Sequence, residues 1–131
     1  MNNYSTKAES LTHKRIVTSL IEYLKKNSWN IVAAASEGYT EPYKVGRHEP
    51  DVIAEKDGIR SFGEAKSGEA DINTEHSREQ YVDFSNMVMK NTNIPCPFYA
   101  AVPENCYSDI KDVFSHLGIL NKNHVEILTY K

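Results

Sequence analysis

Apolar residues recur at helical spacing in two stretches of the chain, residues 8–27 and 75–91. The apolar positions in these stretches are Val17, Leu20, Ile21 and Leu24, and then Tyr81, Phe84, Met87 and Val88. A third helix is predicted over residues 108–117, with Ser108 as its N-cap and Gly118 ending it. Each stretch has one side that is mainly apolar, so each helix is expected to pack against a sheet.

Shorter apolar runs predict strands over residues 29–36, 98–102 and 125–130, and a strand hairpin over residues 51–66. The segments between them, residues 37–49 and 67–74, are polar and contain glycine, so they are expected to be loops. The predicted order is therefore αβββαβαβ. This alternation favours a single α/β domain over residues 1–131, with a mixed central sheet flanked by helices.

The hairpin has a well-defined predicted register. Asp57-Gly58 favours a two-residue turn, because both central residues of such a turn need a positive φ. Lys56 then pairs with Ile59, and the same register places Asp51 opposite Glu64.

Alternation along the strands puts Asp51, Glu64 and Lys66 on the same side as the apolar Ile53 and Phe62. Opposed carboxylates repel each other, and a cation between them removes that cost. Two carboxylates suit Mg²⁺, which completes its shell with water and substrate phosphate oxygens. The alternative is that Glu64 and Lys66 are ordinary exposed strand residues and Asp51 a turn residue.

Pro50-Asp51, a gap of twelve residues, and then Glu64-Ala65-Lys66 resemble the signature of the PD-(D/E)xK nuclease superfamily. That superfamily includes restriction endonucleases, archaeal Holliday-junction resolvases and several exonucleases. The resemblance covers nearly the whole chain, because the superfamily's restriction endonuclease-like core has the same element order, with the catalytic hairpin at the centre of the sheet.

The resemblance also implies a mechanism. Asp51, Glu64 and the backbone carbonyl of Ala65 would hold one or two Mg²⁺ or Mn²⁺ ions. Lys66 would orient the attacking water and stabilise developing charge. The expected product carries a 5′-phosphate.

Glu9 and Gln80 are the other expected catalytic residues. Glu9 lies at the edge of the first helix's apolar side, where the superfamily often has an acidic metal ligand. A favourable charge near the helix amino end explains Glu9 equally well. Gln80 shares a helix side with Tyr81 and resembles a glutamine found after the Glu-x-Lys strand in exonuclease-like members. The match is imperfect, because Phe84 stands where a tyrosine is usual.

Four further residues are expected to contact DNA: Lys44, Arg47, His48 and Ser67. For the first three, a solvated basic loop is the simpler interpretation. His13, on the apolar side of the first helix, is interpreted as a histidine at the edge of the core and not as a ligand.

The overall charge changes this picture. The chain has 15 basic and 18 acidic residues and a net charge of −3, whereas a strong DNA binder usually has a basic surface. A homodimer, or a partner protein, is therefore expected to supply additional contacts to DNA.

Other features suggest a cytoplasmic protein with no membrane association. The longest apolar run, residues 31–35, is too short to span a membrane. Cys96 and Cys106 lack a metal-binding spacing and are expected to be reduced.

The sequence therefore predicts a Mg²⁺-dependent DNA endonuclease, and it favours branched DNA as the substrate, as in the resolvases. Two alternatives remain open. One is a non-catalytic or partner-dependent subunit that keeps the nuclease fold. The other is a restriction or mobile-element endonuclease.

Overall fold

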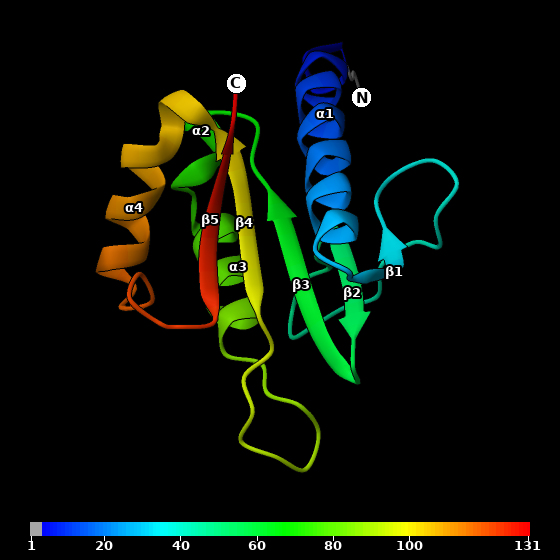
Figure 1. Cartoon of the computed structure of the whole chain (residues 1–131). Coiled ribbons are helices and arrows are strands. Elements are labelled where there is room, and N and C mark those ends of the chain that lie inside the picture. Colours follow the sequence, from blue (N-terminus) through cyan, green and yellow to red (C-terminus); the bar gives the residue numbers. More distant parts are fainter. Residues whose placement is uncertain (1–3) are drawn as a thin grey trace.

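The computed structural model describes the backbone of residues 4–131 and the side chains of residues 11–131. Figure 1 shows its helices and strands. In chain order they are α1 (Tyr4–Lys26), β1 (Asn30–Ala34), β2 (Val52–Lys56), β3 (Ile59–Ala65), α2 (Glu69–Ile72), α3 (Glu75–Ser85), β4 (Phe98–Pro103), the 3₁₀ turn η1 (Glu104–Cys106), α4 (Tyr107–His116) and β5 (Val125–Tyr130).

The five strands form one mixed sheet in the order β1-β2-β3-β4-β5. The β1–β2 and β2–β3 pairs are antiparallel, whereas the β3–β4 and β4–β5 pairs are parallel. Helix α1 lies on one face, and α2, α3 and α4 lie on the other (Figure 1). The predicted α/β class, with a mixed sheet flanked by helices, is confirmed.

The core has two halves because side chains alternate across the sheet. On β4, Ala100 packs with the α3 and α4 side, and Ala101 packs with the α1 side. Gly63 lets α1 approach β3 closely, since a Cβ there would lie 2.7 Å from a methyl carbon of Leu20.

The predicted hairpin is confirmed. Asp57 and Gly58 have φ values of 52° and 80°, as a two-residue turn requires. Lys56 pairs with Ile59, and the register continues to Val52 opposite Gly63.

Three predicted boundaries are wrong. The expected loop 67–74 contains the short helix α2, because Asp71 accepts hydrogen bonds from the backbone of Ser67 and Gly68. Helix α3 ends at Ser85, and Val88 instead forms a bridge with Pro95. Helix α4 begins one residue before Ser108, directly after η1, so Ser108 is not the N-cap.

Two further details, Gly118 and the cysteines, agree with expectation. Gly118 ends α4 with a φ of 74°. Cys96 and Cys106 are buried free thiols. Within residues 4–131, no helix combines the length and the apolar character needed to cross a bilayer.

Candidate active site

Asp51 lies immediately before β2 and extends its pairing with β3. Its backbone N–H donates to the carbonyl of Gly63 at 2.9 Å, and its side-chain Oδ2 accepts from the Ala65 N–H at 2.9 Å. The carboxylate thus replaces the backbone partner that β3 loses where β2 begins. This arrangement brings the Asp51 carboxylate near Glu64. The strand register itself ends at Val52 opposite Gly63, so the predicted pairing of Asp51 with Glu64 stays a prediction.

Glu64 is a buried carboxyl group with an incomplete set of partners. Glu64 is 4% exposed, and its Oε1 has no hydrogen-bond partner among the side chains that the structure describes, residues 11–131. Its other oxygen lies 3.4 Å from Nζ of Lys66. Burial raises the pKa of Glu64 well above its usual value, and the Asp51 carboxylate raises it further against the opposing effect of Lys66.

Lys66 is also buried, with 6% of its surface exposed. Its ammonium group donates a hydrogen bond to Oε1 of Gln80 and lies 5.8 Å from the centre of the Tyr81 ring. Gln80 reaches Lys66 from α3, where the sequence placed it. The hydroxyl of Tyr81 donates a hydrogen bond to the backbone carbonyl of Ile72, at 2.9 Å. We call Asp51, Glu64, Lys66 and Gln80 the Asp51 cluster.

His13 joins this cluster through a contact that sequence reasoning missed. Its Nε2 lies 3.0 Å from Oδ2 of Asp51. This hydrogen bond raises the pKa of His13 and outweighs the opposite effect of burial. The expected position at the edge of the core is correct, but its partner depends on how α1 lies over the hairpin. The sequence would have suggested this contact only if the first helix had been placed over the predicted carboxylates Asp51 and Glu64.

Glu9 belongs to α1, one turn before His13, but its side chain lies outside the described residues. The role predicted for it therefore stays a prediction.

The residues expected to contact DNA lie in two other places. Ser67 directs its N–H and hydroxyl to Asp71, at 3.1 and 3.2 Å. Lys44 is exposed on the loop between β1 and β2.

Arg47 and His48, from the same loop as Lys44, bind carboxylates of α3. Arg47 contacts both carboxylate oxygens of Asp83, at 2.8 and 3.1 Å, and His48 Nε2 lies 3.0 Å from Glu79. We call these four residues the Arg47 clamp. It fastens the loop that leads into Asp51 to the helix that carries Gln80.

The Asp51 cluster offers a donor set that fits a hard divalent cation. Glu64 Oε1 is an unpartnered buried acceptor, and Asp51 supplies the second carboxylate. The carbonyl and N–H of a strand residue point to the same side. Since the Ala65 N–H points to Asp51, the Ala65 carbonyl lies on that side as well.

A third protein ligand is not required for this fit. Among the described residues, no three His, Cys, Asp or Glu side chains are grouped to hold a metal ion. Mg²⁺ is commonly bound by one or two carboxylates and completes its shell with water and substrate phosphates.

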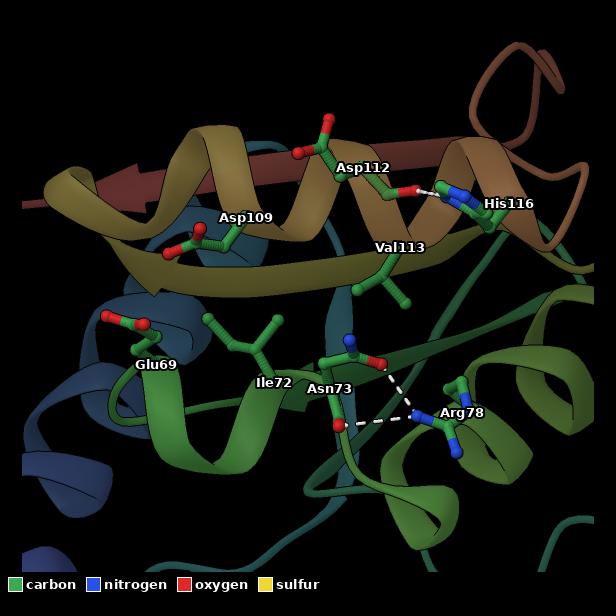
Figure 2. A pocket seen from close by; sticks show the side chains of 8 residues that line it. All are labelled: Glu69, Ile72, Asn73, Arg78, Asp109, Asp112, Val113 and His116. Carbon is green, nitrogen blue, oxygen red and sulfur yellow. Dashed lines mark hydrogen bonds between the residues drawn. The ribbon is translucent and has the colours of Figure 1, made fainter.

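A second region with several carboxylates lies away from this cluster. Figure 2 shows the side chains that line a cavity beside α2 and α4. The volume of this cavity is about 460 Å³. Glu69, Asp109 and Asp112 are among its lining residues, while Arg78 binds Asn73 at 2.7 Å. It lacks the buried lysine and opposed carboxylates of the Asp51 cluster. The candidate active site is therefore the Asp51 cluster, although this cavity is spacious.

Comparisons with protein-family models, curated proteins and solved structures found no match to this chain.

Proposed function

We propose that this protein is a Mg²⁺-dependent DNA endonuclease of the PD-(D/E)xK type, with a restriction endonuclease-like topology. One observation supports this most strongly. The buried Glu64 keeps an unpartnered oxygen while Asp51 lies beside it and the buried Lys66 lies 3.4 Å away. Two buried ionisable groups beside a third, partly exposed carboxylate are costly unless they bind something charged.

Asp51, Glu64 and the Ala65 carbonyl would hold the cation. When bound, Mg²⁺ or Mn²⁺ would supply Lewis-acid activation of water and neutralise charge on the phosphate. Asp51 precedes the pairing of Val52 with Gly63, which brings its carboxylate near Glu64, and the Ala65 N–H fixes the orientation of Asp51.

Besides the bound cation, the site would have one positive charge from the protein itself, the ammonium group of Lys66. Gln80 holds its ammonium group, which limits the positions that the flexible side chain adopts. An oriented ammonium group in a dry site stabilises the charge that develops on the phosphate in the transition state. Gln80 is therefore a positioning residue.

Regarding partners, we propose that the enzyme acts in the cytoplasm as a homodimer or with a partner protein, and prefers branched DNA. The net charge of −3 supports this, because a lone domain has few cations to spare for a duplex. Sedimentation at micromolar concentration, run beside the cleavage assay, tests it. A monomer that cuts DNA efficiently at physiological salt would contradict the proposal.

The decisive experiment uses linear, nicked, single-stranded and four-way-junction DNA, with and without Mg²⁺ or Mn²⁺. Asp51→Asn is the matched variant, because an asparagine oxygen still accepts from the Ala65 N–H. We expect wild type to cut at least one substrate only with the cation, and the variant to be inactive.

Equal cleavage by the two proteins would place the chemistry elsewhere. Absence of cleavage on every substrate would favour the alternative, a nuclease-fold subunit that needs a partner.

A further inference from the structure

A second cavity begins directly beside the Asp51 cluster. It has a volume of about 380 Å³ and lies at the carboxyl ends of the parallel strands β3, β4 and β5. Ser67, the residue after Lys66, lines it, as do Thr12 and Ile16 on either side of His13 in α1. Ligands of α/β sheets commonly bind outside the carboxyl ends of the strands.

The walls of this cavity combine three kinds of surface. Ile16, Pro103 and Tyr130 provide apolar surface. Arg15 and Lys131 provide positive charge, and Glu69 and Asp109 provide carboxylates. A cation suits a phosphate, an apolar surface suits the face of a base, and a carboxylate accepts from the amino group of cytosine or adenine.

The volume limits what enters. It lies within the range of sites that hold one small ligand, about 300–1,000 Å³. One nucleotide outside the base stack meets this limit, whereas a base pair within a stacked duplex does not.

We propose that this cavity holds one unpaired nucleotide next to the scissile phosphate, so that the enzyme selects DNA whose cut strand is unpaired on one side. The proposal rests on the proposed nuclease function and names its class of substrate. Arg15 binds the phosphate of that nucleotide, and the apolar wall receives its base.

The test measures binding without cleavage. Fluorescence anisotropy in the absence of divalent cations compares an intact duplex with the same duplex bearing a short single-stranded flap. Stacking of one unpaired base on a protein surface strengthens binding by about tenfold. We expect wild type to bind the flap DNA tighter by about that factor.

Two variants examine the cavity independently. Arg15→Ala removes its cation, and Asn105→Trp fills it from the η1 side without changing charge. Both residues are exposed, so both variants are expected to fold. Each should reduce the flap preference to near onefold while leaving duplex binding within about twofold.

Lys14→Ala and Asn121→Trp are the matched controls, since both residues are exposed and neither lines this cavity. They should leave the flap preference unchanged. A wild type without preference for the flap, or a preference that survives both cavity variants, would overturn the proposal.

The outcome separates this proposal from the proposed function. Cleavage by wild type together with an unchanged preference in Arg15→Ala and Asn105→Trp would reject the cavity alone. A preference that disappears in those variants, with no cleavage of any DNA, would reject the nuclease function and retain the cavity as a nucleotide site.

Discussion

The Asp51 cluster and the Arg47 clamp both gather two carboxylates and positively charged groups, yet they differ in burial and in pairing. Arg47 has 56% of its side chain exposed, and it contacts both oxygens of Asp83. Glu64 and Lys66 are 4% and 6% exposed, and Glu64 keeps an unpartnered oxygen. A paired cluster that is partly exposed stabilises a fold modestly, whereas a buried and unsatisfied one costs stability. The difference indicates that the clamp positions a loop and that the Asp51 cluster binds a ligand.

The largest expected effect follows from removing the buried cation. Lys66→Met keeps the volume of the side chain but removes its charge, so cleavage should fall by about 10²–10³-fold. Metal binding should persist, because the carboxylates remain. Single-turnover cleavage measures the first effect, and Lys90→Met, in an exposed loop, is the control. Cleavage by Lys66→Met at nearly the wild-type rate would show that Lys66 has no catalytic role.

A smaller loss of cleavage rate is expected when Lys66 keeps its charge but loses its hydrogen bond to Gln80. Gln80→Ala removes the hydrogen bond to Nζ and should slow cleavage by about tenfold. Gln80→Glu should restore part of the rate, because it also offers an oxygen to the ammonium group. Glu75→Ala, at the exposed start of α3, should have no effect. If Gln80→Ala lowers the melting temperature and leaves the rate unchanged, its role is structural.

Cation binding should appear as added stability. At a concentration ten times the dissociation constant, Mg²⁺ or Mn²⁺ stabilises the folded protein by about 1.4 kcal/mol. Thermal unfolding should therefore shift upward by about 3–6 °C in wild type and not in Asp51→Asn. An equal shift in both proteins would place the metal outside the cluster.

The smallest effect is expected at the Arg47 clamp. Hydrogen bonds from Arg47 lower the pKa of Asp83. A carboxyl group whose pKa is lowered on folding contributes stability above its unfolded value, and this contribution is lost as the pH falls through the folded value. Asp83→Asn should lower the melting temperature at neutral pH by about 3 °C and reduce the loss of stability on acidification.

Cleavage should change less in Asp83→Asn than in Gln80→Ala. The reverse order would show that the clamp, and not the buried cluster, controls the chemistry.

Local signals explain what the sequence predicted well. The turn at Asp57-Gly58 sets the register from its own φ requirement, and that register runs as far as Val52 opposite Gly63, next to Asp51 and Glu64. Helical phase within one segment was enough to direct Gln80 toward the sheet.

Long-range contacts explain what it missed. The bond from His13 to Asp51 spans 38 positions and requires the placement of a whole helix on the sheet. The contact from Arg47 to Asp83 spans 36 positions and joins two segments with no common pattern. Helix α2 was missed because Gly68 and Asp71 resemble turn residues, although Asp71 here caps the backbone before it.

The contact between Gly63 and Leu20 sets the height of α1 above the sheet. Leu20 lies seven residues after His13 on the same helix, about 10 Å along its axis. A side chain at position 63 would displace the Leu20 side chain, and a shift of α1 that relieves this contact would move His13 relative to Asp51. The size of this one residue therefore works as a spacer between two layers of the protein. A graded series of substitutions at Gly63 would tune the distance of His13 from Asp51 without altering either residue.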